Sequence, residues 1–475
     1  MKTGRFFHPV IVAVAAAATL LPLLGQTRVV SRHEIRHAEI AREMAISGDF
    51  LFPRLLGEPY RDKPPVLSAA TALAYRLAGE PSIALARAPS AAAAIAAALV
   101  LYAIGCALAD RRTALWAALA MIGVQGMQQL GRTARPDMLF TLALLLSCLA
   151  SLSALGRRDS RGRLGGFALA GAAAAVATLV KGPLAWAFSL LFPIVIAAQR
   201  SDLRSPRLLD WLAFVTGLAI TAAIWAVPVY LRDHGEYLRS FLTQPDLTTW
   251  TLGASLGRIH RPWMYSLAGF LPLTLLLPAL VRDVRRRALG PAATIALGML
   301  VILSVIPKKR IHYQLPVYPF LALAVAETAI RAGGARFVGF VFRGLVVLAL
   351  IAGPLYFAAV LPWLEPDEDV SLAVARKILR SVEPGPPILC LGDIAEAIAF
   401  VGRRDDVSRA ADAKDLGRRL HASGPGAYLL LPAEQAGLAR ELAGDLAGRN
   451  APERIAEVRD GAEAWTVYRM DSTGH

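Results

Sequence analysis

Two short segments near the N-terminus gather the residue types that could do chemistry. The first carries ionisable side chains on an amphipathic pattern, namely His33, Glu34, Arg36, His37, Glu39, Arg42 and Glu43. Its spacing predicts a helix over 33–44 that can lie on a membrane surface. In the second, 53–65, prolines and turn residues bring Asp62 and Lys63 to the start of an apolar stretch. A carboxylate and a cation held at a membrane surface suit a lipid-linked phosphate, and a merely solvated loop is the alternative.

Four further cations occur near the ends of apolar stretches. Lys181 could face a site or extend its charge to the membrane surface, as lysines at helix ends commonly do. Arg258, His260 and Arg261 precede Trp263. They could bind an anionic donor or acceptor, or they could belong to an interfacial anchor with the tryptophan.

The composition identifies the elements that must position these residues. Of the 475 residues, 55% are hydrophobic and 18% are charged, and the apolar residues form long unbroken blocks. A soluble domain has about 45–50% apolar and about 25% charged residues. The sequence therefore predicts a polytopic α-helical membrane protein in contact with lipids, and it excludes a disordered chain and a soluble nucleic-acid binder. Three cysteines without ligand spacing indicate no disulfide framework or zinc cluster.

Because a span needs about 20 mostly apolar residues, we expect roughly 11 to 13 transmembrane helices. The candidate spans are 9–26, 89–109, 113–130, 138–155, 164–180, 184–198, 209–231, 263–280, 291–307, 314–330 and 337–361. Compact basic loops, such as the one with Arg282 and Arg285–Arg287, should be cytoplasmic, and the formal charge of +15 is explained by such loops. The loop 27–65 should then face outward. The apolar segment 66–79 is short and contains Arg76, so it is either a juxtamembrane or half-crossing helix, or one half of a pair whose partner is merged with a neighbour.

The composition changes abruptly at Pro362, where a polar run begins. Residues 387–391, 427–431 and 464–470 read as strands, and 433–446 as an amphipathic helix. We therefore expect a module 1–361 in the membrane and an α/β accessory domain, 362–475, outside the cytoplasm.

Several ordered motifs resemble one family. The string 34–65 is similar to the first periplasmic loop of bacterial aminoarabinose (lipid A) transferases and of the wider protein mannosyltransferase superfamily of GT-C glycosyltransferases. The resemblance continues in Ala86-Arg87-Ala88-Pro89-Ser90, Ala134-Arg135-Pro136-Asp137, Lys181-Gly182-Pro183 and 309–319. Each tripeptide alone is a weak signal, but the order of the set over 1–361 is specific.

The resemblance implies a transferase of the bacterial inner membrane. It would take a sugar from a polyprenyl-phosphate donor and place it on an acceptor at the periplasmic face, such as lipid A or another envelope glycan or protein. Lys63 would bind the donor phosphate with help from Arg36 and Tyr313, and Asp137 would add a second acidic group. No nucleotide-sugar site is required. No cofactor is certain, and Asp62 could hold a divalent metal ion or orient Lys63.

One position departs from the family pattern, because His33 stands where the family has the aspartate of an Asp-Glu pair. Histidine can act as a base near neutral pH. Three readings therefore stay open: His33 or Glu34 takes over the acid–base work, Asp137 carries it, or the protein has lost transferase activity.

Two other functions compete with the transferase. A non-catalytic GT-C homologue would bind a lipid-linked sugar without transferring it. A transporter or flippase would place ionisable residues near the bilayer midplane and repeat its helices in matching halves. The predicted spans carry few charges, which disfavours the transporter.

Overall fold

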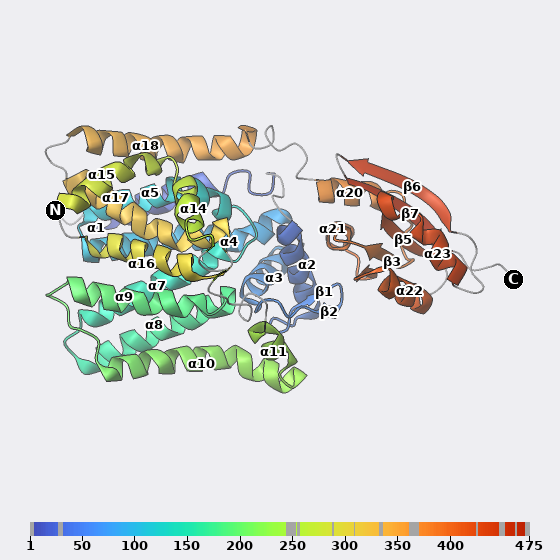
Figure 1. The fold of residues 1–475 in the computed structure, drawn as a ribbon, viewed down its shortest axis with the longest axis horizontal. Helices are drawn as coiled ribbons and strands as arrows, with labels where there is room; N and C mark the ends of the chain where they lie inside the picture. The colour runs from blue at the N-terminus through green and yellow to red at the C-terminus, as the bar shows by residue number, and fades with distance from the viewer. Residues whose placement is uncertain are drawn as a thin grey trace. The chain divides into compact units, whose positions relative to one another are not determined.

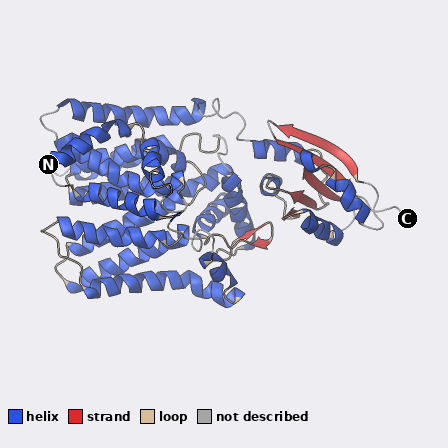
Figure 2. Cartoon of the chain, viewed as in Figure 1, coloured by secondary structure: helices blue, strands red, loops and turns tan. Residues whose placement is uncertain are grey.

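The computed structural model is mostly helical and describes residues 4–26, 32–243, 253, 257–286, 289–307, 309–331, 336–360, 370–423, 426–445, 452–460 and 463–470 (Figures 1 and 2). The chain divides into two compact units. The first contains 1–25, 61–70 and 87–358, and the second contains 26–60, 71–86 and 359–475. The predicted domain boundary at Pro362 lies outside the described residues.

The first unit is a helical bundle. Its long helices are α4 (Ile83–Leu108), α7 (Asp137–Leu155), α8 (Ser160–Lys181), α10 (Leu208–Asp233) and α18 (Arg336–Leu355). Each is long and apolar enough to cross a membrane, and the pair α14 (Arg261–Gly269) and α15 (Leu277–Arg286) passes the same test as one bent span. These helices confirm a polytopic α-helical membrane protein.

Shorter elements fill the rest of this unit. They are α1 (Gly4–Leu20), α5 (Arg111–Gly123), α6 (Gln125–Gly131), α9 (Leu184–Gln199), α11 (Glu236–Leu242), η1 (Leu273–Leu276), α16 (Pro291–Val305), η2 (Ile311–Val317), α17 (Tyr318–Arg331) and η3 (Tyr356–Val360). Several expected spans are interrupted: 113–130 breaks at Val124, and 314–330 begins as the 3₁₀ helix η2. The apolar content of a segment alone does not predict where a helix within it breaks.

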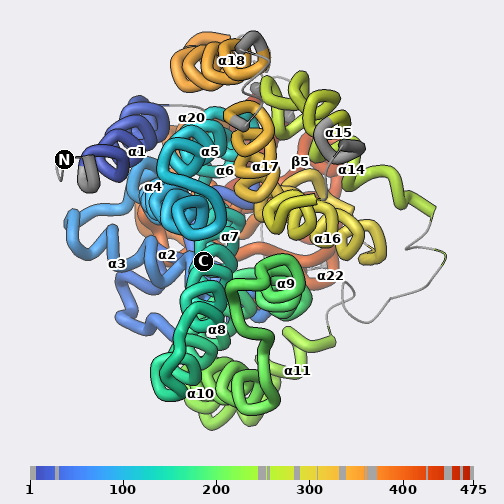
Figure 3. Tube along the Cα trace, turned by 90° about the vertical axis from the view of Figure 1, so that its left-hand side faces the viewer, coloured from blue at the N-terminus to red at the C-terminus, as the bar shows by residue number. Residues whose placement is uncertain are grey.

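Helix α8 packs between α7 and α10, as Figure 3 shows nearly end-on. Two glycines allow α8 and α10 to approach closely. A Cβ added to Gly171 would lie 1.9 Å from the Phe214 carbonyl oxygen, and one added to Gly217 would lie 2.0 Å from that of Ala168. Small residues at such crossings let helix backbones pack closely in membranes. A buried ion pair also joins the two helices near their N-terminal ends, where Arg163 Nη2 lies 2.6 Å from Asp210 Oδ2.

The second unit contains a mixed sheet. Strands β3 (Ile388–Leu391), β4 (Val407–Ala410), β5 (Ala427–Pro432), β6 (Glu453–Asp460) and β7 (Glu463–Met470) lie in the order β4-β3-β5-β7-β6. The pairs β4–β3 and β3–β5 are parallel, whereas β5–β7 and β7–β6 are antiparallel. Helices α20 (Val370–Leu379), α21 (Ile394–Gly402), α22 (Ala413–Ala422) and α23 (Leu438–Asp445), with the 3₁₀ turn η4 (Ala433–Gln435), accompany the sheet. The small α/β domain predicted after 362 is confirmed, and β4, β6 and three of these helices add to the prediction.

The same unit includes α2 (Arg32–Ser47), the hairpin β1 (Arg54–Leu55) and β2 (Glu58–Pro59), and the end of α3 (Val66–Ala78). The helix predicted over 33–44 is therefore present. Buried Ile40 shows that its apolar face packs against protein, although the amphipathic pattern was expected to rest on a membrane.

Candidate functional site

The site in the first unit begins at the N-terminus of α7. Asp137 is the first residue of this helix, and its side chain is only 1% exposed. Lys181, the last residue of α8, donates from Nζ to Asp137 Oδ1. A charge is costly to bury unless it is paired, so this contact accounts for both residues at this depth. Lys181 is thus engaged in the site rather than extended to a membrane surface.

Two further side chains complete the surroundings of Asp137. Arg135 Nε lies 3.4 Å from Asp137 Oδ2, and Arg135 Nη2 lies 3.3 Å from Nδ1 of His312. Burial and the nearby cations Lys181, Arg135 and Arg310 lower the pKa of His312 to about 3, against the opposing effect of Asp137. The ring is therefore neutral at pH 7, which lets Nδ1 accept from Arg135.

Tyr313 follows His312 in η2, and its ring faces the Lys181 ammonium group. Lys181 Nζ lies 4.6 Å from the centre of the Tyr313 ring and 5.5 Å from that of Phe140. Such cation–π contacts favour the charged form of the lysine in a half-buried position. Burial also raises the pKa of the Tyr313 hydroxyl, so this group stays a hydrogen-bond donor at neutral pH.

Lys63 enters the cluster from the segment before α3. The Tyr237 hydroxyl of α11 donates to the Lys63 backbone carbonyl at 2.6 Å, and this tyrosine is completely buried. Burial lowers the pKa of Lys63 to about 8, with Lys181, Arg135 and Arg310 lowering it further and Asp137 opposing them. The lysine is therefore close to the other charged groups and still mostly protonated at pH 7.

The charge balance of this cluster is positive. Lys63, Arg135, Lys181 and Arg310 are cations, and Asp137 is the carboxylate they share among the residues that the structure describes. Such an excess of N–H donors in a half-buried position suits an anion with several oxygens, such as a phosphate.

The pKa of Lys63 gives a prediction on pH. A lysine with a pKa near 8 loses its charge as pH rises through that value, so affinity for a polyprenyl phosphate should fall between pH 7 and pH 9. Bound phosphate favours the charged form and will move the midpoint upward. Titration of the Kd by tryptophan fluorescence measures the effect. Lys63→Arg should bind with little pH dependence, because an arginine stays charged, and equal profiles for the two proteins would contradict the assignment.

The other predicted residues are placed as follows. Asp62 is exposed, and no three His, Cys, Asp or Glu side chains in the described part of the chain gather to hold a metal ion. The divalent ion therefore stays a prediction without a described ligand set.

Arg258 and His260 are exposed in a turn and Arg261 begins α14. Among the residues that the structure describes, none of these three has a contact that assigns it a ligand.

His33, Glu34 and Arg36 lie on α2 in the second unit, where Glu34 is buried and His33 is exposed. Arg36 Nη2 lies 3.2 Å from Oε1 of Glu396 on α21, and Arg409 Nη1 lies 2.9 Å from the same oxygen. Arg32 and Arg409 also share Asp393. Arginines of α2 thus bind carboxylates of the C-terminal sheet domain, a pairing that the sequence did not predict.

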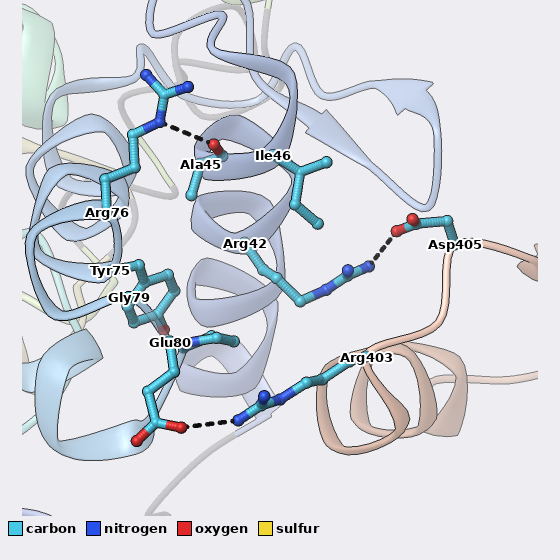
Figure 4. A pocket seen from close by; sticks show the side chains of 10 residues that line it. Arg42, Ala45, Ile46, Tyr75, Arg76, Gly79, Glu80, Arg403 and Asp405 are labelled. Atoms are coloured by element: carbon cyan, nitrogen blue, oxygen red, sulfur yellow. Dashed lines mark hydrogen bonds and ion pairs between the residues drawn. The ribbon is translucent and has the colours of Figure 1, made fainter.

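Farther along α2, Arg42 donates to buried Glu39 and to Asp405, and Arg403 contacts Glu80 at 3.1 Å. Figure 4 shows the Arg42–Asp405 and Arg403–Glu80 pairs beside a cavity, whose volume is about 340 Å³. Burial raises the pKa of Glu39 to about 7, although Arg42 opposes this shift. These contacts explain why α2 belongs to the same compact unit as the sheet.

Glu396→Gln should loosen this unit. Glu396 is 3% exposed and its Oε1 serves two arginines, so loss of its charge should cost about 2 kcal/mol after allowance for the exposed faces of Arg36 and Arg409. Hydrogen–deuterium exchange of α2 and α21 should accelerate by roughly 30-fold. Asp405→Asn is the matched control, since Asp405 is 70% exposed and Arg42 retains Glu39. Equal exchange in Glu396→Gln and wild-type protein would show that the pair is not stabilising.

Sequence reasoning missed Arg135, His312 and Arg310 as members of the cluster. All three lie inside motifs that carried the resemblance, within three residues of Asp137 or Tyr313. They could have been predicted from their position in the same motif as a candidate residue, a few residues away.

Comparisons with known proteins identify related sequences. The family described as dolichyl-phosphate-mannose-protein mannosyltransferase matches residues 62–226. The undecaprenyl phosphate-alpha-4-amino-4-deoxy-L-arabinose arabinosyl transferase of Aeromonas hydrophila is 29% identical over 325 residues, which are 66% of this chain and 58% of the relative. The chain thus matches less than two thirds of the length of this relative.

Solved structures show the same fold. The crystal structure of ArnT from Cupriavidus metallidurans bound to undecaprenyl phosphate aligns with a TM-score of 0.73 at 19% identity, and covers 98% of each chain. The apo form of that protein aligns with a TM-score of 0.75 at 18% identity, again over 98% of each chain. These findings confirm the resemblance to the aminoarabinose transferases, and the chain has the fold of a GT-C glycosyltransferase.

Proposed function

We propose that the protein is a membrane glycosyltransferase that moves a sugar from a polyprenyl-phosphate donor to an acceptor outside the cytoplasm. The observation that carries the proposal is the cluster of Lys63, Arg135, Lys181 and Arg310 around Asp137. The names of the similar proteins, which specify undecaprenyl phosphate, support the same donor class.

The cations would stabilise the departing phosphate. Sugar transfer builds negative charge on the phosphate oxygen that leaves the sugar, and charged donors fixed beforehand act on this charge without rearranging. Lys63 and Arg310 are the cations without a close carboxylate contact among the described residues, so they are proposed to contact the phosphate directly. Lys181 and Arg135 would hold Asp137, and the Tyr313 hydroxyl would add a neutral donor.

Acid–base work is assigned to His33 or Glu34 in preference to Asp137. Asp137 already accepts from Lys181 and Arg135, so it suits orientation of cations better than deprotonation of an acceptor. An imidazole can accept a proton near neutral pH, and His33 supplies one. The role of Arg36 in donor binding stays a prediction from the sequence.

We place the site at the periplasmic face of the inner membrane. The support comes from the basic loops, which should be cytoplasmic under the positive-inside rule, and from the apolar helices that make the chain multi-pass. The acceptor is proposed to be lipid A or another envelope glycan or protein.

The test is transfer from a radiolabelled polyprenyl-phosphate sugar in nanodiscs that contain the full-length protein and a lipid A acceptor. Labelled glycolipid should form, and addition of a chelator during the assay should leave it unchanged if no divalent ion takes part. Donor binding without transfer would instead support the non-catalytic homologue. Donor-independent sugar flux into proteoliposomes would support the transporter.

His33→Asp separates the remaining readings. If His33 serves as the base, wild-type protein is active and the aspartate variant changes the pH dependence of the rate. If wild-type protein is silent and the variant transfers sugar, the chain is a non-catalytic homologue that lost its base.

A further inference from the structure

The bent helix pair α14–α15 encloses a groove that the proposed transfer reaction does not use. The chain bends by 109° between the helical segments Arg261–Gly269 and Leu273–Arg282, and η1 begins the second segment. Thr274 donates from its hydroxyl to the Leu267 carbonyl, which ties the corner together. Figure 3 shows both helices at the edge of the helical unit. A cavity of about 470 Å³ lies in this angle.

The lining of the groove is apolar with a charged end. Leu267, Leu277, Pro278 and Val281 provide the apolar walls, and Thr274 and Arg282 are its polar groups. Leu267 and Val281 are 46% and 51% exposed, so the apolar surface is open to its surroundings. In a membrane, such a surface is covered by a hydrocarbon chain.

The helix α15 separates apolar from basic residues. Leu277, Leu280 and Val281 precede Arg282 and the arginines that follow it, and the segment 282–287 holds four arginines and one aspartate. The basic end of such a helix lies at the membrane interface, where it attracts anionic headgroups. The same segment is predicted to be cytoplasmic by its charge.

We propose that the angle between α14 and α15 binds one anionic phospholipid of the cytoplasmic leaflet. An acyl chain would lie on Leu267, Leu277 and Val281, and the headgroup phosphate would contact Arg282. The 10 residues of α15 extend over about 15 Å, which is close to the hydrocarbon depth of one leaflet. This length fits a phospholipid chain, whereas a long polyprenyl chain would exceed it.

Native mass spectrometry of the full-length protein tests the proposal. The protein is released from nanodiscs made of equal parts phosphatidylglycerol and phosphatidylcholine, and the retained lipids are counted. Wild-type protein should keep one phosphatidylglycerol in preference to phosphatidylcholine. Arg282→Gln should reduce this preference roughly fivefold, the effect of one interfacial cation. Val281→Trp should fill the groove and remove the bound lipid of either kind.

Matched controls separate the groove from general effects. Arg112→Gln removes another exposed cation predicted to be cytoplasmic, and Val347→Trp enlarges another exposed apolar residue, at α18. Both should retain the lipid as wild-type protein does. Equal retention of the two lipids by wild-type protein overturns the proposal, as does a wild-type result for both groove variants. Displacement of the lipid by inorganic phosphate overturns it as well, because it would identify a free-anion site.

Discussion

Lys63→Ala should lower the rate of sugar transfer by at least about 100-fold, because it removes one fixed cation from the developing charge on the donor phosphate. The effect should appear mainly in kcat/KM, since donor binding and the transition state both lose the contact. The measurement is transfer from a polyprenyl-phosphate sugar in nanodiscs, with donor Kd measured in parallel.

Arg61→Gln is the control for this variant. Arg61 lies two residues away and contacts exposed Glu236 at 2.6 Å rather than the cluster. Its replacement should change transfer by less than about threefold, as expected for an exposed pair. If Lys63→Ala retains the rate of this control while it binds donor normally, the phosphate assignment is wrong.

Asp137→Asn should cost both stability and activity. Asp137 is the carboxylate that Lys181 and Arg135 contact, and removal of one partner from a buried ion pair destabilises a protein by about 3 to 5 kcal/mol. The free energy of unfolding in mixed detergent micelles measures the first effect. Transfer should fall below detection because the cations lose their fixed positions.

A double variant separates these two effects. Asp137→Asn with Lys181→Met removes the uncompensated charge, so it should recover most of the lost stability. Activity should remain absent, because the double variant lacks the ion pair that holds the site. Recovery of activity together with stability would show that Asp137 is needed only for folding.

The sequence was sufficient to predict the class of fold and two central residues of the cluster. Apolar blocks indicated membrane helices, and the short strands at 388–391 and 427–432 were recognisable from their composition. Lys63 and Asp137 were found because each lies in a motif of the resemblance. Lys181 was left between two interpretations, since a lysine at a helix end gives no information about which carboxylate it meets.

Other features depend on contacts between distant segments. The pairing of Arg36 with Glu396 joins residues 360 positions apart, and no local sequence pattern around either residue predicts it. The break at Val124 and the bend between α14 and α15 differ, because glutamines and a glycine follow Val124 and Pro272 lies in the bend, signals that a count of apolar residues overlooks. Strand β4 was missed because its sequence, Val-Ser-Arg-Ala, is short and half polar, and its order comes from pairing with β3.

The close crossing of α8 and α10 has a consequence for how the site can vary. Lys181 is the last residue of α8, so its position depends on how closely α8 and α10 pack at Gly171 and Gly217. A single methyl group at either glycine would push two backbones apart and tilt the end that carries Lys181. Gly171 and Gly217 therefore restrict the charge cluster although they do not belong to it, because larger residues at these positions would displace Lys181.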